Sequence, residues 1–492
     1  MATRDSKAAI HLLADKIASI RSQAQPYADR IKQASPGIVK LAIHEIRVCN
    51  ALVRYLGDLL VGTFSEEDLD LEVSKIAHAI LILARTTRFF ASDDNLINHY
   101  DSLSPWENLV KSISADADVI IRSQSAYEFE SYLEIRDMLE RILPLDVSRA
   151  DVFRGFPKHF IVLNIPIVQA WNVLHYALLA HEIGHFIYNV EQLEQIPLAV
   201  VPEYRERLVE FFKRERGTTP DLEAFDDEFS RFLQTWSKVI TSRYKELMSD
   251  TFGAYIIGPC ILFALRDFGL PGFRLDFAPG DGERFLGYPS FRKRFLLLLQ
   301  AIRPFTEGTF RTETADNKRA VRRLRRFLKT WGLALRQPAA AADDRYGLIE
   351  QIVDECVTRA LTKVSAANYP WRYDAALYRT ELFELYNRIL DDIPPNEIRN
   401  GQAAAVGTPA HWQSILNAAW LYYLDFRTEK FDVFRWNDGK LSEDTINHRH
   451  KSLRRFNDFV TRSIELSIVH ERFLKDKRCL EGILDDPVEI DD

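Results

Sequence analysis

Helical periodicity runs through most of this 492-residue chain and predicts a mainly α-helical fold. Over residues 1–145, glycine and proline are sparse and no alternating strand pattern appears. Apolar residues recur there at helical spacing in four segments, residues 6–33, 37–61, 67–90 and 127–143. We therefore expect residues 1–150 to form a helical N-terminal region.

The length and composition are those of a globular protein with a core of its own. At roughly 100–200 residues per domain, the chain could form about two to four domains or one large helical body. Its 64 Lys and Arg against 71 Asp and Glu give a net charge of −7, which argues against a general nucleic-acid-binding protein. The four cysteines lie far apart without a CxxC pair, which argues against a disulfide framework or a cysteine zinc cluster.

The distribution of apolar residues argues against membrane insertion. The first residues mix charged and apolar side chains, without the uninterrupted apolar stretch of a signal peptide. The longest apolar run, FGAYIIGPCILFAL at residues 252–265, contains Gly258 and Pro259 and is too short to span a bilayer. We therefore expect no membrane span and a cytoplasmic location.

The character of the sequence changes in its middle third. KHFIVLNIPI, at residues 158–167, is rich in β-branched residues and predicts a short strand. Beyond it we expect, in order, a long apolar helix, a surface loop and a second helix, at residues 168–190, 214–228 and 229–257. We assign residues 151–300 to a central domain and residues 301–492 to a helical C-terminal region with an acidic tail.

The sequence HEIGH, inside the long apolar helix, has the HExxH pattern of a metal site. His181 and His185 lie four residues apart, so a helix places both imidazoles on one face, where they can bind one ion. Glu182 can hold a metal-bound water and accept its proton, because the ion lowers the pKa of that water towards 7. The alternative is that both histidines are ordinary core residues.

A catalytic zinc ion usually has a third protein ligand besides a water. A third histidine from the same segment is excluded, because Tyr188 and Glu191 occupy the glycine and histidine positions of that pattern. The downstream sequence ELMSD offers carboxylates instead. We expect Glu246 to bind the ion, and Asp250, on the same helical face, to accept the N–H of a ligating imidazole and fix its orientation. The alternative is a pair of solvated carboxylates.

HEIGH followed by ELMSD resembles the glutamate-ligand zincins, or gluzincins. A weaker similarity connects YPSFRKRF, at residues 288–295, with a segment of the form HPSxxxRI in the HtpX and CAAX prenyl protease family. Pro289, Ser290 and Arg294 match that segment, and Tyr288 stands where the family has histidine. That family is embedded in membranes, whereas this chain has no clear span.

The resemblance implies a zincin-like metallopeptidase core, made of a small β element and active-site helices. It implies that zinc (Zn²⁺) polarises the scissile carbonyl of a protein or peptide substrate, while Glu182 activates water and passes its proton to the leaving amine. Tyr288 is either a hydrogen-bond donor to the developing oxyanion, as in other gluzincins, or a packed surface residue. If residues 160–163 form an edge strand, a substrate could bind there as an added strand.

A separate segment, residues 318–329 (KRAVRRLRRFLK), combines seven basic residues with apolar residues at helical spacing. It is either a site for a nucleic acid or an acidic partner, or a solvated helix face. The long flanks are also compatible with a regulatory protease of a stress or defence pathway that a protein partner releases. The main alternative to an enzyme is a helical interaction protein with a structural or inactive zincin core, and the intact Glu182 favours the enzyme.

Overall fold

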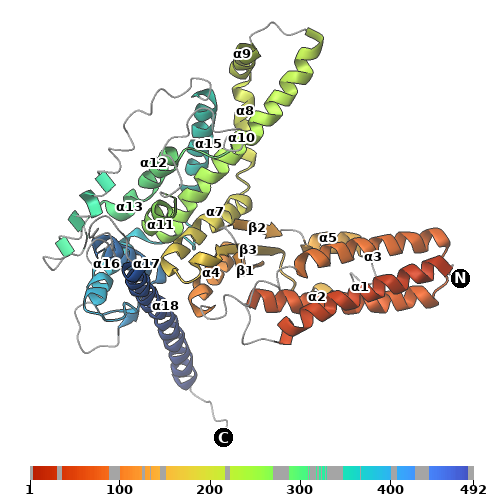
Figure 1. Cartoon of the computed structure of the whole chain (residues 1–492), viewed down its shortest axis with the longest axis horizontal. Coiled ribbons are helices and arrows are strands. Elements are labelled where there is room, and N and C mark those ends of the chain that lie inside the picture. Colours follow the sequence, from red (N-terminus) through yellow and green to blue (C-terminus); the bar gives the residue numbers. More distant parts are fainter. Residues whose placement is uncertain are drawn as a thin grey trace. The chain divides into compact units, whose positions relative to one another are not determined.

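α-Helices make up most of the chain, as the periodicity predicts (Figure 1). The structure is a computed structural model, and it describes residues 4–29, 36–87, 100–124, 128–132, 135–143, 151–216, 222–269, 287–308, 310, 317–318, 321–322, 324–326, 328–329, 347–365, 367–399, 407–426 and 443–485. Of the predicted acidic tail, residues 485–492, all but Asp485 lie outside these ranges.

The chain forms two compact units, Met1–Ala170 and Trp171–Asp492. This division differs from the one expected at residues 150 and 300. Residues 159–166 form a strand that pairs with two earlier strands, which places them in the first unit. Helices on both sides of residue 300 pack against one long helix, residues 222–257, and therefore share the second unit.

The helices of the first unit surround an apolar core. They are α1 (Arg4–Asp29), α2 (Pro36–Val61), α3 (Glu66–Thr86), α4 (Tyr100–Ile113) and α5 (Ile135–Ile142), with 3-10 turns η3 (Asp151–Phe153) and η4 (Ile167–Gln169). In Figure 1, α1, α2 and α3 run side by side, and Ile17, Leu52 and Leu83 are fully buried. The hydroxyl of Ser65 accepts the backbone N–H of Asp68 at 3.1 Å and so caps the start of α3.

A three-stranded sheet completes the first unit. Its strands are β1 (Ala117–Gln124), β2 (Glu128–Tyr132) and β3 (His159–Pro166), in the order β1-β3-β2. β3 pairs in parallel with β1 and antiparallel with β2. Side chains on both faces of β3 are buried, which explains its continuous apolar sequence. The strand predicted at residues 158–167 is therefore confirmed.

Three expectations about this region are wrong. β3 is the central strand and not an edge strand, so both of its backbone edges are already paired and no substrate strand can add to it. The N-terminal region is not wholly helical, because β1 and β2 lie within it. The helix predicted over residues 127–143 is divided into β2 and the short α5, because pairing with the distant β3 outweighs the local helical pattern.

The second unit is almost entirely helical. Its elements are η5 (Val173–Leu178), α7 (Leu179–Val190), α8 (Gln195–Glu203), α9 (Arg205–Arg216), α10 (Leu222–Ile257), α11 (Cys260–Gly269), α12 (Phe291–Ala301), α13 (Arg303–Thr306), α15 (Gly347–Ser365), α16 (Ala375–Leu390), β4 (Glu397–Ile398), β5 (Thr408–Pro409), α17 (Trp412–Phe426) and α18 (Glu443–Asp485). β4 and β5 form a small antiparallel pair.

Two predicted boundaries in this unit shift. The helix expected over residues 168–190 becomes regular only at Leu179, after the 3-10 turns η4 and η5. The loop expected over residues 214–228 is shorter, because α9 continues to Arg216 and α10 begins at Leu222. Within the described ranges, none of the helices combines the length and hydropathy that crossing a bilayer requires.

α7 and α10 are in close backbone contact where they cross. A Cβ atom added to Gly184 of α7 would lie 2.4 Å from the carbonyl oxygen of Ser249 on α10. A Cβ added to Gly253 of α10 would lie 3.3 Å from backbone atoms of Ala180 and His181. Glycine at these two positions therefore lets the helix that carries HEIGH lie directly against the helix that carries ELMSD.

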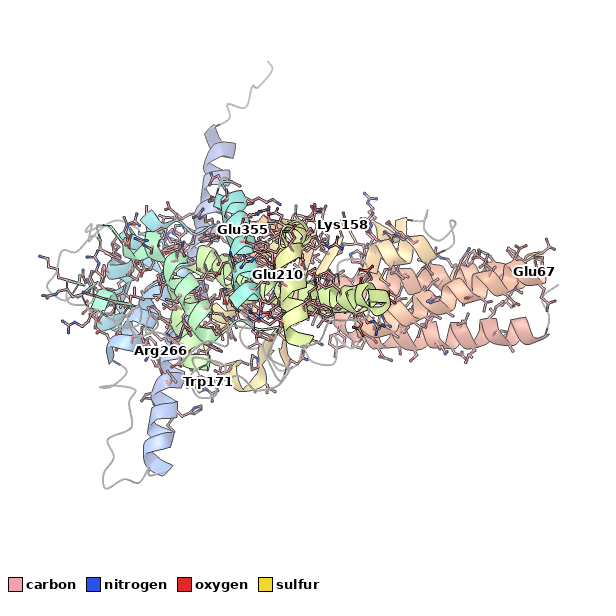
Figure 2. The ribbon with its side chains drawn as sticks, turned by 90° about the horizontal axis from the view of Figure 1, so that it is seen from above. Glu67, Lys158, Trp171, Glu210, Arg266 and Glu355 are labelled. Atoms are coloured by element: carbon pink, nitrogen blue, oxygen red, sulfur yellow. The ribbon has the colours of Figure 1, made fainter. Side chains whose placement is uncertain are left out.

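Ion pairs connect the neighbouring helices of this unit. Glu350 of α15 pairs with Arg243 of α10 and with Lys293 of α12. Further along α15, Arg359 donates hydrogen bonds to two carboxylates. One is that of Glu355 on the same helix (Figure 2 labels Glu355), and the other is that of Glu203 on α8, at 2.7 Å. These charged contacts place α12 and α15 along α10, beside the crossing with α7.

Candidate metal centre

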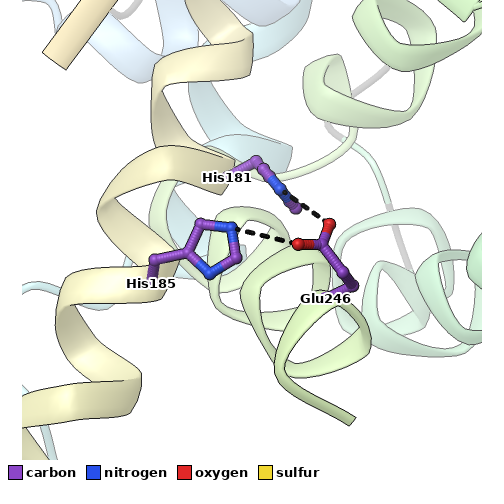
Figure 3. A group of neighbouring side chains, drawn as sticks. All are labelled: His181, His185 and Glu246. Carbon is purple, nitrogen blue, oxygen red and sulfur yellow. Dashed lines mark ion pairs between the residues drawn. The ribbon is translucent and has the colours of Figure 1, made fainter. Parts of the chain in front are cut away.

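Three side chains converge where α7 crosses α10. His181 and His185 lie one turn apart on α7, and Glu246 faces them from α10 (Figure 3). The Nε2 atom of His181 lies 3.4 Å from Oε2 of Glu246, and Nε2 of His185 lies 3.5 Å from Oε1. One ligand atom from each residue falls within 4.8 Å of the others. The structure thus brings together the three residues expected to bind a metal.

The distance from each histidine to the nearer oxygen of Glu246 is close to the donor–donor distance around a small tetrahedral ion. Two donors that each lie 2.0–2.1 Å from a tetrahedral zinc ion are about 3.4 Å apart. Two imidazole nitrogens and one carboxylate oxygen match the donors of catalytic zinc sites, which leave a fourth position for water. Both histidines are 8% exposed, so the donors lie at the edge of the core rather than on open surface.

The charges of this cluster are unevenly distributed. Burial would lower the pKa of His181, but the Asp250 carboxylate and then Glu246 raise it to about 10. Burial, together with repulsion from His181, lowers the pKa of His185 to about 3. Without a metal, His181 is therefore a cation with a proton on both ring nitrogens, whereas His185 is a neutral imidazole with a proton on one of them. A metal ion would displace the proton from Nε2 of His181, because a ligating nitrogen must be free.

Asp250 occupies the predicted position behind His181. Its Oδ1 accepts the Nδ1–H of His181 at 2.8 Å. The same carboxylate accepts two hydrogen bonds from Arg294 of α12, at 2.6 and 2.7 Å. Burial alone would raise the pKa of Asp250, but Arg294 and His181 hold it well below its ordinary value. Asp250 is therefore a fully buried, ionised carboxylate with charged partners.

Sequence reasoning assigned no role to Arg294, although it noted the residue as a match in YPSFRKRF. A guanidinium nitrogen of Arg294 also lies 3.9 Å from Oε2 of Glu246. Arg294 thus lies near both the Glu246 carboxylate and the Asp250 carboxylate, which accepts the hydrogen bond from His181. The signal in the sequence was a basic residue in the segment after ELMSD, but only the packing of α12 on α10 shows what it contacts.

Ser249 is the residue that sequence reasoning missed. Its hydroxyl lies 2.8 Å from Nδ1 of His185 and donates to the backbone carbonyl of Lys245 at 2.9 Å. The side chain is fully buried. The sequence does contain a signal for a role of Ser249 beside the histidines. Positions 246, 249 and 250 of ELMSD share one helical face, so Ser249 lies on the same side of the helix as Glu246 and Asp250.

The two residues expected to act on the substrate have different surroundings. Glu182 is 8% exposed on α7. Burial lowers the pKa of His181, whereas Asp250 and Glu246 raise it, and the charge of Glu182 adds to their effect. Tyr288 lies in the turn before α12 and is 48% exposed. Burial lowers the pKa of Arg294, but Asp250 and then Glu246 raise it above its ordinary value, and Tyr288 adds to their effect. Tyr288 is therefore a neighbour of Arg294.

The basic segment at residues 318–329 has the expected two faces over the residues that the structure describes. Its buried side chains are Val321 and Leu324, whereas the exposed ones are all basic, namely Lys318, Arg322, Arg325, Arg326 and Lys329. Arg325 also donates to the carbonyl of Gly308 at 2.8 Å.

No protein-family model, curated protein or solved structure matches this chain. The case for the site therefore stands on the geometry of His181, His185 and Glu246 and on the contacts of their supporting residues.

Proposed function

We propose that the protein is a zinc-dependent peptidase of the gluzincin type, with His181, His185 and Glu246 as the metal ligands. The observation that supports it most is the arrangement of Glu246, whose two carboxylate oxygens each face the Nε2 atom of a different histidine. Three donors of this kind, partly buried and backed by hydrogen-bonding partners, are characteristic of a zinc site with an open position.

The proposed reaction is hydrolysis of a peptide bond in a protein or peptide substrate. A zinc ion, when bound, would lower the pKa of a water molecule and polarise the scissile carbonyl. Glu182, next to a ligand on the same helix, accepts the proton of that water and delivers it to the leaving amine. Tyr288 donates a hydrogen bond to the developing oxyanion. Asp250 and Arg294 hold His181 in place throughout.

Elemental analysis of the purified full chain tests the metal site. We expect about one zinc per chain in the parent protein and little in His181→Ala. His78→Ala, which removes an exposed histidine of α3, is the matched control and should keep the parent's zinc content. A parent protein that takes up no zinc, even after reconstitution, would contradict the site.

Cleavage of fluorescently labelled casein tests the role of Glu182. Glu182→Gln should keep its zinc and lose activity by ~100-fold or more, because general-base catalysis contributes typically 10²–10⁴-fold. Cleavage at the parent's rate in Glu182→Gln would exclude the general-base role. Bound zinc without any cleavage that depends on Glu182 would instead support the interaction protein with an inactive core.

A further inference from the structure

We propose that Ser249 is a positioning residue that holds His185 in the tautomer with its proton on Nδ1, so that Nε2 is free to bind the metal. This inference rests on the proposed zinc site. It concerns the chain's own hydrogen bonds, however, and can be measured without a metal.

The direction of the hydrogen bond follows from the number of protons available. A serine hydroxyl has one proton, and Ser249 donates it to the carbonyl oxygen of Lys245 at 2.9 Å. Towards Nδ1 of His185, 2.8 Å away, the same oxygen can then act only as an acceptor. In this arrangement Nδ1 carries the proton of the neutral imidazole, and the lone pair lies on Nε2, which faces Glu246.

The helix crossing fixes the position of Ser249 beside His185. Ser249 is fully buried, and its backbone lies directly against Gly184, the residue before His185. A Cβ at Gly184 would approach the Cα of Ser249 to 2.8 Å, so the two backbones are in contact at this point. His185 and Ser249 are thus placed by the same contact between α7 and α10.

The two histidines are supported by different chemistry. His181 donates to Asp250, an ionised carboxylate paired with Arg294. His185 donates to the neutral hydroxyl of Ser249. Because charge-assisted hydrogen bonds are stronger than neutral ones, the tautomer of His185 depends more on the exact placement of its partner. Removing a partner behind a metal ligand typically weakens metal binding 10–100-fold, and we expect the lower end of this range at Ser249.

Thr251 provides a matched control on the same helix. Its hydroxyl also donates to the carbonyl four residues earlier, Leu247, at 2.9 Å, and it is 1% exposed. Thr251→Val and Ser249→Ala therefore each remove one buried hydroxyl with one bond to the helix backbone. Only Ser249→Ala also removes the contact with His185.

The first measurement is nitrogen NMR of the zinc-free full chain labelled with ¹⁵N-histidine, at a pH where His185 is neutral. We expect the Nδ1–H form of His185 in the parent and in Thr251→Val. In Ser249→Ala we expect the Nε2–H form or a mixture of both. An Nε2–H form in the parent, or an unchanged tautomer in Ser249→Ala, would overturn the proposal.

The second measurement is zinc affinity, determined by competition with a chelator. The dissociation constant should rise by ~10-fold in Ser249→Ala and remain at the parent value in Thr251→Val. Equal affinities in parent and Ser249→Ala would overturn the positioning role. If the parent binds no zinc, the proposed enzyme is contradicted, and the tautomer measurement still decides the role of Ser249.

Discussion

Two buried carboxyl groups show how the surroundings of a residue decide its charge. Asp250 accepts hydrogen bonds from His181 and Arg294, and these partners keep its pKa low although burial opposes them. Glu45 of α2 is 1% exposed, and burial raises its pKa to about 8 against a hydrogen bond from Thr86. At pH 7 Asp250 is therefore ionised and Glu45 is mostly neutral.

The neutral state of Glu45 predicts a pH dependence for the stability of the first unit. The unfolded chain releases this proton near pH 4.5, whereas the folded chain keeps it up to about pH 8. Between these values Glu45 holds its proton in the folded state and not in the unfolded state, so its contribution to stability should fall as the pH rises, by at most ~1.4 kcal/mol per pH unit. Urea unfolding of the full chain at several pH values measures this slope.

Glu45→Gln keeps the shape of the side chain but cannot ionise, so it should flatten the dependence. Glu67→Gln, at an exposed position on α3 labelled in Figure 2, should keep the parent's slope. Identical slopes in the parent and in Glu45→Gln would show that Glu45 is not the residue responsible.

At the scale of elements, one helix pair carries most of the candidate site. α7 supplies two of the proposed ligands and Glu182, whereas α10 supplies Glu246 together with Asp250 and Ser249, which lie within hydrogen-bonding distance of the two histidines. This geometry requires close packing, because the ligand atoms and the hydrogen bonds behind them all span the gap between the two helices. Gly184 is the residue on which that packing depends most.

Gly184→Ala should therefore damage both stability and metal binding. The added Cβ would lie 2.4 Å and 2.8 Å from backbone atoms of Ser249, which cannot move aside as a flexible side chain would. Overpacking of this kind typically costs about 1–3 kcal/mol. We expect a lower melting temperature, and zinc affinity reduced by more than in Ser249→Ala because the helices move apart.

Gly57→Ala is the matched control for this substitution. Gly57 lies within α2, where an added Cβ would meet no other atom within 4 Å. Alanine is the better helix former, so Gly57→Ala should stabilise the protein by roughly 0.5–1 kcal/mol. Stabilisation by Gly184→Ala as well would contradict the close crossing of α7 and α10.

At the scale of the whole molecule, the candidate site belongs to one unit. The ligands, Glu182 and the residues that orient the histidines all lie between residues 181 and 294, within Trp171–Asp492. A ligand that binds only the folded state stabilises the part of the structure that it holds together. Zinc should therefore protect the second unit without protecting the first.

Hydrogen exchange of the full chain, read peptide by peptide with mass spectrometry, measures this difference. Removing zinc with a chelator should increase exchange in α7, α10 and α12 several-fold and leave α1, α2 and α3 unchanged. His181→Ala, treated in the same way, should show no response to the chelator. Equal loss of protection in both units would contradict the assignment of the metal to the second unit alone.

Most of the helical regions and the two histidines of the candidate metal site could be predicted because their signals are local. Periodicity over a single segment predicts α1, α2 and α3, and spacing within five residues places His181 beside His185. The pairing of Glu246 with them was a hypothesis based on ELMSD, and the geometry brings these residues together. The strands β1 and β2 were missed because each is a short segment defined by its pairing with β3.

The sequence by itself determined the candidate metal ligands on α7 and most of the long helices, since both depend on neighbours along one chain segment. Only the tertiary structure decided what stands behind each ligand. Ser249 reaches His185 across 64 residues of sequence, and Arg294 reaches Asp250 across 44. Such contacts arise from the way whole helices pack, which no single segment encodes, and they set the protonation and orientation of the ligands.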